Sequence, residues 1–298
     1  MHRTGLWPPV ATPFGSDGRV DTAALLSHAR NLIADGASGL APLGTTSEAN
    51  SMTMQERRAV LDALLNGGID AEKLLPGTGA CATDDAIVLS RHATTMGCAG
   101  VLLLPPFFYK GVSDDGLFNY VAQVIDGVDD PALRIYLYHI PQMAGVGWSL
   151  DLIDRLRRSF PEIIVGLKDS SGDWSNTRAV IESFDGFGVF PANEAHLSMA
   201  MPLGAAGCIS ATANINAGGI AALINALHAG HDATALQQEA TRLRLAVTAG
   251  PLIPGIKATL ALQYNTPDWA RVRPPLVAMQ PDAAQALYAT LSQKAVST

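Results

Sequence analysis

The stretch Glu162-Ile163-Ile164-Val165-Gly166-Leu167-Lys168-Asp169-Ser170-Ser171-Gly172 lies near the middle of the chain and decides the fold. Its apolar, β-branched first half predicts a buried strand, and its polar, glycine-containing end predicts a turn. The segment that follows, Trp174–Phe184, has the spacing of an amphipathic helix. The stretch therefore predicts one strand–turn–helix unit with a lysine at the carboxyl end of the strand.

The same unit recurs along most of the chain. Eight strands are expected at Gly5–Thr12, Gly39–Leu43, Leu74–Thr78, Gly100–Leu104, Arg134–Tyr138, Ile163–Lys168, Gly186–Phe190 and Gly207–Ala211. The intervening helices are expected at Thr22–Asp35, Thr53–Asn66, Thr83–Met96, Asp115–Asp126, Leu150–Ser159, Trp174–Phe184 and His196–Leu203. Thr53 and Glu56 have the spacing of a capping box, and Asp17-Gly18 predicts a tight turn, as in a small hairpin.

Alternating strands and helices predict a parallel sheet, and eight repeats favour an α/β fold of the closed (β/α)8 TIM-barrel type. An open nucleotide-binding sheet would carry a glycine-rich turn after its first strand, whereas this chain has Pro8-Pro9-Val10-Ala11-Thr12 there. Helical patterns continue after Asn214, at Ile220–Ala229, Ala233–Thr248 and Asp282–Gln293. We therefore expect a barrel domain over residues 1–214 and a C-terminal helical extension over residues 215–298.

Composition narrows the range of partners. The 298 residues are 48% hydrophobic and 16% charged, which is enough apolar material for a large core, and the formal net charge is −7. A negative net charge argues against nucleic acid or an anionic membrane surface as the partner. It leaves open a small anionic substrate, because backbone N–H groups in a local pocket can bind a carboxylate.

Three cysteines, Cys81, Cys98 and Cys208, are scattered and odd in number. This usage is typical of reduced thiols, so we expect a cytoplasmic protein. The first residues lack the apolar segment of a signal peptide, and the most apolar stretch, Gly97 to Phe108, is too short for a bilayer span.

Lys168 is one of only five lysines. An amine surrounded by apolar side chains loses hydration, which favours its neutral, nucleophilic form and hence imine formation with a carbonyl substrate. The ordinary alternative is a lysine whose stem is buried and whose ammonium group reaches water.

Other polar residues follow the neighbouring strands, and in an eight-stranded barrel such residues meet at one mouth. Thr45 and Thr46 lie in the turn Gly44-Thr45-Thr46-Ser47-Glu48, where free N–H groups and hydroxyls can hold a carboxylate, although an ordinary polar turn looks the same. Tyr138 can both donate and accept a proton, although many core tyrosines only anchor a carbonyl.

In these motifs the chain resembles the dihydrodipicolinate synthase / N-acetylneuraminate lyase family, the class I, Schiff-base-forming pyruvate aldolases and lyases. The resemblance runs nearly end to end. It rests on residues 12–21 and 44–57, on Tyr138-His139-Ile140-Pro141, on residues 166–172 and on residues 207–214.

The resemblance implies a (β/α)8 barrel with a helical C-terminal domain, assembled as a homotetramer that is a dimer of dimers. It further implies that Lys168 forms the imine with pyruvate or another 2-oxo acid and that Tyr138 moves protons, with Thr45 as its relay partner. Thr46 would bind the substrate carboxylate together with Thr45, and the Ile209 carbonyl would line the imine site. Such chemistry needs no cofactor or metal, and His228 and His231 lack a third ligand nearby in the sequence.

Three positions depart from the dihydrodipicolinate synthases. Met143 stands where those enzymes have an arginine that binds the carboxylate of the second substrate, and methionine cannot replace it. Their Pro-Tyr-Tyr segment corresponds here to Pro106-Phe107-Phe108-Tyr109, which is one residue longer, so whether Phe108 or Tyr109 reaches a neighbouring subunit's site is open. His139 replaces the usual asparagine, and either substrate contact or a structural role is consistent with it.

Asn193, Glu194 and Ser210 fall near positions that the sugar-acid lyases use for substrate hydroxyls. The alternative is that Asn193 caps a helix and Glu194 lies in its first turn.

The leading hypothesis is a class I lyase that cleaves or forms a 4-hydroxy-2-oxo acid, such as a 2-keto-3-deoxy sugar acid, with pyruvate and an aldehyde as partners. The alternatives are a dihydrodipicolinate synthase, a dehydratase or deaminase that uses the same imine, and a non-catalytic keto-acid sensor. The sequence leaves open the aldehyde, the stereochemistry and the pathway.

Overall fold

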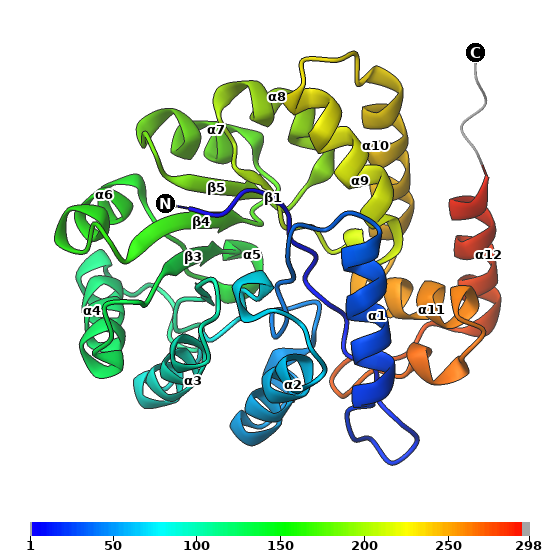
Figure 1. Cartoon of the computed structure of the whole chain (residues 1–298), viewed down its shortest axis with the longest axis horizontal. Helices are drawn as coiled ribbons and strands as arrows, with labels where there is room; N and C mark the ends of the chain where they lie inside the picture. The colour runs from blue at the N-terminus through cyan, green and yellow to red at the C-terminus, as the bar shows by residue number, and fades with distance from the viewer. Residues whose placement is uncertain (1, 294–298) are drawn as a thin grey trace.

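A computed structural model describes residues 2–293 and shows a closed ring of parallel strands surrounded by helices (Figure 1). The regular strands are β1 Gly5–Leu6, β2 Val101–Leu103, β3 Ile135–His139, β4 Ile164–Asp169, β5 Gly188–Pro191 and β6 Gly207–Cys208. Strands β2 to β5 form one parallel sheet, and β1 pairs with β6. The predicted (β/α)8 barrel is therefore confirmed.

The second and third expected strands take part through single bridges and backbone hydrogen bonds. Leu40 bridges Leu74, and Gly77 bridges Leu102. The amide of Ala41 donates to the Pro8 carbonyl at 2.8 Å, which joins the first and second strands. Prolines explain why the first three strands are shorter than expected: Pro8 and Pro9 in the first, Pro42 in the second and Pro76 in the third have no N–H to donate to a ladder.

Eight helical segments follow the strands and cover the outside of the barrel. They are α1 Thr22–Ala34, α2 Met54–Asn66, α3 Thr83–Thr95, α4 Asp114–Val128, α6 Leu150–Ser159, α7 Trp174–Ser183, α8 Leu197–Ala200 and α9 Ala213–His228. A short helix, α5 Pro141–Ala144, follows β3, and 3₁₀ turns occupy Ala49–Ser51, Ala71–Lys73, Glu194–His196, Met201–Leu203 and Pro267–Ala270.

Two local predictions are confirmed. Thr53 accepts from the Glu56 amide while Glu56 accepts from the Thr53 amide, which is the complete capping box at the start of α2. Phe14 and Val20 form an antiparallel bridge around the Asp17-Gly18 turn, so the small hairpin is present.

Three further helices lie together on one side of the barrel: α10 Thr234–Thr248, α11 Leu252–Gln263 and α12 Pro281–Ser292 (Figure 1). Helix α11 was not predicted, because Pro251, Pro254 and Gly255 are normally helix breakers. Pro254 is tolerated since it lies in the first helical turn, where its missing N–H would have no partner. The helix expected at His196–Leu203 is instead three short pieces, with Pro202 inside the last of them.

Helix α9 crosses the expected domain boundary between residues 214 and 215 and packs against α1 and β1. The division into two domains stays a prediction. No single helix among residues 2–293 is long and apolar enough to span a bilayer; only α10 and α11 together reach that length and composition, with a bend of 109° between them.

The barrel interior has its own apolar core. It contains one buried side chain from each of seven of the eight strands expected from the sequence, namely Trp7, Ala41, Leu75, Leu102, Tyr136, Phe190 and Ile209. This layer fills the centre of the ring, which leaves the mouth at the carboxyl ends of the strands as the place where polar side chains can meet a ligand.

Candidate active site

A cavity of about 320 Å³ opens at the carboxyl ends of the strands. Its walls come from the barrel turns on one side and from α10 and the segment Pro251–Pro254 on the other. The lining includes Thr45, Thr46, Tyr138, Ile140, Gln142, Met143, Lys168, Asp169, Ala192, Asn193, Ile209 and Arg244. Of the eight residues expected to form the site, six line this cavity.

Lys168 lies near the end of β4 and is 3% exposed. Parallel pairing of β3 with β4 places Tyr138 directly beside Lys168 in register. As a result Lys168 Nζ lies 4.1 Å from the centre of the Tyr138 ring. The amine is thus held against an aromatic face inside the cavity.

Tyr138 and Thr45 form the second expected contact. Their hydroxyl groups lie 3.0 Å apart, and either can be the donor. A chain of two hydroxyls can pass a proton in either direction, which is the property that a relay requires. The structure therefore brings together Lys168, Tyr138 and Thr45 as one contiguous group.

The turn that carries Thr45 and Thr46 is tied down on several sides. Thr12 Oγ1 donates to the Ser47 carbonyl at 2.9 Å, and the Ser47 hydroxyl donates to the Val10 carbonyl. Thr46 is itself buried. The first strand thus fixes the conformation of the expected carboxylate cradle.

The C-terminal helices hold the same turn through a buried ion pair. Lys257 on α11 donates to Glu48 Oε1 at 2.6 Å, and the Arg273 amide donates to Glu48 Oε2 at 2.8 Å. Burial lowers the pKa of Lys257, while the nearby Glu48 carboxylate raises it in part. Sequence reasoning missed Lys257, although a lysine in the apolar run Ile256–Ala258 was a usable signal.

Ile209 lines the same cavity as Lys168 and is fully buried. His139 is buried outside the lining, where its Nδ1 accepts from the Trp148 amide at 3.1 Å. Burial lowers the pKa of His139, with Asp169 acting in the opposite direction. Of the two roles open to His139, the structure therefore provides contacts for the structural one.

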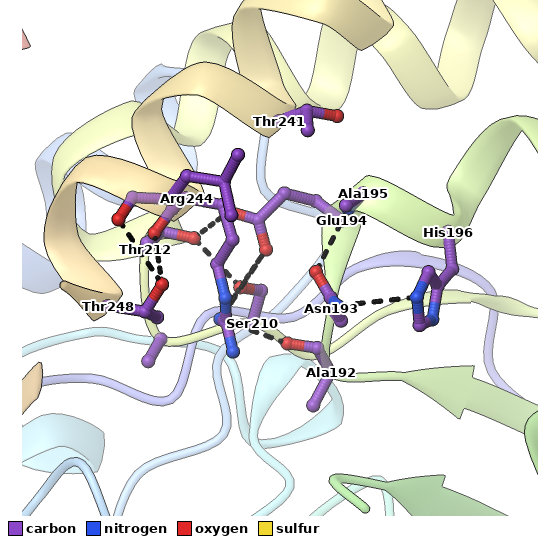
Figure 2. Close-up of polar contacts among 12 residues, drawn as sticks. Ala192, Asn193, Glu194, Ala195, His196, Ser210, Thr212, Thr241, Arg244 and Thr248 are labelled. Atoms are coloured by element: carbon purple, nitrogen blue, oxygen red, sulfur yellow. Dashed lines mark hydrogen bonds and ion pairs between the residues drawn. The ribbon is translucent and has the colours of Figure 1, made fainter. Parts of the chain in front are cut away.

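Asn193, Glu194 and Ser210 are close in space but differ in position. Asn193 lines the cavity, and its Oδ1 accepts from the Ala195 amide, so it caps the short 3₁₀ turn that follows. Glu194 and Ser210 are buried behind the wall, where both the Ser210 and the Thr212 hydroxyls donate to the Glu194 carboxylate (Figure 2). Direct contact of Glu194 and Ser210 with substrate stays a prediction.

Arg244 on α10 was not anticipated from the sequence. It lines the cavity and lies 3.6 Å from Glu194 Oε2 (Figure 2). Its place in the cavity was hard to predict, because Arg242 and Arg244 both lie in a segment with the sequence pattern of an ordinary surface helix.

Met143 lines the outer part of the cavity and is 62% exposed. Phe108 and Tyr109 are also exposed, and their rings meet edge to face with centroids 5.2 Å apart. Neither aromatic ring lines the cavity of its own chain. Among residues 2–293 there is no cluster of three His, Cys, Asp or Glu side chains with the arrangement of a metal site.

Comparison with known proteins agrees with this geometry. The model of the dihydrodipicolinate synthetase family matches residues 2–294. A DapA-like lyase of Chloroflexus aurantiacus is 34% identical over 286 residues, which is 96% of this chain and 95% of that protein.

Solved structures give the same result. Dihydrodipicolinate synthase from Agrobacterium tumefaciens superposes with a TM-score of 0.90 at 30% identity, covering 97% of this chain and 98% of that one. A prophage protein of the dihydrodipicolinic acid synthase family from E. coli K12, in complex with pyruvate, gives a TM-score of 0.88 at 27% identity, with 97% of both chains covered. The chain therefore belongs to the dihydrodipicolinate synthetase family of lyases.

Proposed function

We propose that this lyase forms an imine between Lys168 and pyruvate or another 2-oxo acid, and that it cleaves or forms a 4-hydroxy-2-oxo acid. The observation that carries the proposal is the contiguous group in the cavity. Lys168 Nζ lies 4.1 Å from the centre of the Tyr138 ring, and the Tyr138 hydroxyl lies 3.0 Å from Thr45 Oγ1. The pyruvate complex of the E. coli relative supports pyruvate as the 2-oxo acid.

Each residue has a defined part in the cleavage direction. The neutral amine of Lys168 attacks C2, and Tyr138 gives its proton to the departing C2 hydroxyl, so that water leaves and a protonated imine forms that can accept an electron pair. The Tyr138 phenolate then takes the C4 hydroxyl proton as the C3–C4 bond breaks, and the bonding pair moves toward the imine nitrogen to give an enamine and an aldehyde. Tyr138 returns this proton to C3, and hydrolysis of the resulting imine releases pyruvate and restores the amine and the phenol.

The cradle around Thr45 and Thr46 holds the carboxylate during these steps, and the Ile209 carbonyl faces the imine. A fixed carboxylate orients C2 toward Lys168, so the reacting groups start in the correct geometry. We expect no metal or organic cofactor to take part. A homotetrameric assembly and a cytoplasmic location belong to the same proposal.

For the second half of the substrate we propose a 2-keto-3-deoxy sugar acid. Asn193 supplies a polar wall in the cavity, and polar groups there suit a hydroxylated chain. The relative from A. tumefaciens is a dihydrodipicolinate synthase, which keeps that activity as the second candidate. Met143 argues against it, because it offers no charge at the position where the resemblance places the synthases' arginine for the semialdehyde carboxylate.

Product analysis separates these functions. The protein is incubated with 2-keto-3-deoxy sugar acids, and separately with pyruvate and aspartate semialdehyde. The proposed lyase releases pyruvate and an aldehyde; a dehydratase releases water without pyruvate, and a deaminase releases ammonia. Condensation of aspartate semialdehyde would identify a dihydrodipicolinate synthase, while an imine without turnover on any substrate would indicate a keto-acid sensor.

A further inference from the structure

Arg244 projects from α10 toward the cavity that contains Lys168. Lys168 and Arg244 are the two cationic side chains among the residues that line this cavity. Lys168 comes from a barrel strand and Arg244 from the helices of the C-terminal side, so the two cations enter from different elements. If Lys168 is consumed in an imine, Arg244 is the remaining cation that can meet an anionic group.

Hydrogen bonds to the barrel hold the Arg244 side chain in place. Its Nη1 donates to the Ala192 carbonyl and to Ser210 Oγ, both at 3.3 Å (Figure 2). Glu194 lies 3.6 Å away, which is an ion-pair distance and too long for a good hydrogen bond. The Glu194 carboxylate already accepts from two hydroxyls, those of Ser210 and Thr212, and does not depend on Arg244 to be satisfied.

The rest of the guanidinium group is uncommitted. Within residues 2–293, Nε and Nη2 of Arg244 make no hydrogen bond, and the side chain is 19% exposed. The cavity lining that contains Arg244 includes the apolar residues Leu252, Ile253 and Leu276. Partial desolvation by such residues strengthens a charge-assisted hydrogen bond to a ligand.

We infer that Arg244 binds a second carboxylate at the far end of the substrate, so that this enzyme selects 2-oxo acids carrying a distal carboxylate. The inference rests on the proposed function, because it takes the imine at Lys168 as the near anchor. It assigns to α10 the recognition that Met143, an uncharged side chain on α5, cannot provide. Glu194 and Ser210 then act as positioning residues that orient the guanidinium group.

A carboxylate fits this site better than a phosphate. Two adjacent guanidinium N–H groups match the two oxygens of a carboxylate, and Nε and Nη2 form such a pair. A phosphate dianion has three oxygens and would lie near the Glu194 carboxylate with a single arginine to compensate it.

The test measures imine formation, so it needs no turnover. The half-saturating concentration for borohydride trapping at Lys168 is determined for three length-matched pairs of 2-oxo acids. The dicarboxylates are 2-oxoglutarate, 2-oxoadipate and 2-oxopimelate, and their neutral-tailed partners are 2-oxopentanoate, 2-oxohexanoate and 2-oxoheptanoate. For at least one length we expect the dicarboxylate to saturate at a concentration about tenfold or more below its partner, as expected for a charge-assisted hydrogen bond.

Substitution localises the effect. Arg244→Gln should raise the half-saturating concentration of the preferred dicarboxylate about tenfold to hundredfold and leave its neutral partner nearly unchanged. Arg244→Lys, which keeps the charge and loses the paired N–H groups, should recover part of the preference. Arg242→Gln is the matched control: it lies on the same helix, pairs with Glu239 and is absent from the cavity lining, so the preference should persist.

Three results overturn the inference. The first is a wild-type protein that traps pyruvate but prefers no dicarboxylate at any length, a result that stands even if Arg244 variants fail to fold. The second is a preference that survives in a folded Arg244→Gln protein. The third is tighter binding of a 2-keto-3-deoxy-6-phospho sugar acid than of every dicarboxylate. A folded wild-type protein that traps no 2-oxo acid at all would instead remove the proposed function itself.

Discussion

Lys257 and Glu48 form an ion pair in which both side chains are completely excluded from solvent. Lys257 belongs to α11, and Glu48 ends the turn that carries Thr45 and Thr46, so the pair links the C-terminal helices to the expected carboxylate cradle. Glu48 also has a left-handed backbone with φ of 57°, which is unfavourable for a side chain larger than glycine. The pair therefore helps to hold a strained residue in the conformation that the cradle requires.

Removing one partner of this ion pair should strongly lower the stability of the fold. Lys257→Met leaves the Glu48 carboxylate buried without its cation, and we expect the free energy of unfolding in urea to fall by about 3–5 kcal/mol. Among molecules that remain folded, the half-saturating pyruvate concentration for imine trapping should also rise, because Thr45 and Thr46 lose their support.

The double variant Lys257→Met with Glu48→Gln tests the physical cause. With no charge left unpaired, it should regain a large part of the lost stability. A double variant no more stable than Lys257→Met would show that packing, and not an uncompensated charge, sets the cost.

The lowered pKa of His28 leads us to expect a loss of stability in mild acid. It is buried between Asn214 and Tyr264, and burial lowers its pKa from 6.5 to about 4 in spite of the hydrogen bond to Asn214. Between these two pH values the unfolded chain binds a proton that the folded chain does not. The free energy of unfolding should therefore fall as the pH drops from about 6.5 to about 4, by up to about 1.4 kcal/mol per pH unit from this group.

The effect of His28 on stability is expected at a higher pH than the effect of carboxylates such as Glu56. A hydrogen bond to Arg273 lowers the pKa of Glu56 to about 2, so the stability that Glu56 contributes is lost only below about pH 4.5. His28→Gln should reduce the slope between pH 6.5 and 4.5, while the exposed His228→Gln should leave it unchanged. The pKa of His139 and of His196 is also lowered, mainly by burial, and a residual slope from both should remain. Equal slopes for wild type and His28→Gln in urea titrations would contradict the assignment.

Tyr138 and Thr45 should affect proton transfer more than imine formation. Tyr138→Phe keeps the ring over Lys168 but removes the hydroxyl 3.0 Å from Thr45 Oγ1. Turnover of the 4-hydroxy-2-oxo acid should fall by about 10²–10⁴-fold. Borohydride trapping of pyruvate should persist, and Thr45→Val should show a milder form of the same split. Unchanged kcat in Tyr138→Phe would take the phenol out of the proton path.

Met143 separates the two candidate activities. Met143→Arg places a cation on the exposed side of the cavity, and we expect it to increase condensation of pyruvate with aspartate semialdehyde, because an arginine can bind the semialdehyde carboxylate. Met143→Leu, which adds no charge, is the control and should not do so. Efficient condensation by the unmodified protein would instead favour the synthase.

The barrel was predictable because its evidence is periodic and local. Runs such as Ile163–Lys168 have the apolar pattern of buried strands, and the Thr53–Glu56 spacing fixes where α2 begins. Lys168, Tyr138 and Thr45 were predictable because each follows a strand, and a barrel gathers strand ends at one mouth.

Other features depend on long-range packing that local patterns do not contain. Lys257 and Glu48 are 209 positions apart, and nothing near either residue predicts that α11 will bring them together. Because a proline normally breaks a helix, Pro254 kept the start of α11 from being predicted. Ile253 and Pro254 were therefore not expected in the cavity wall. Arg244 and Arg242 look alike in the sequence, and only the packing of α10 against the barrel distinguishes the cavity side from the outer side.

The central claim is the imine at Lys168, and mass spectrometry after borohydride reduction with pyruvate tests it most directly. Intact-protein mass should show one pyruvate-derived adduct per chain, and peptide mapping should place it on Lys168. Lys168→Ala should give no adduct, while Lys110→Ala, which removes an exposed lysine that does not line the cavity, should give the same adduct as wild type. A folded wild-type protein without an adduct, or an adduct that persists in Lys168→Ala, would contradict the account.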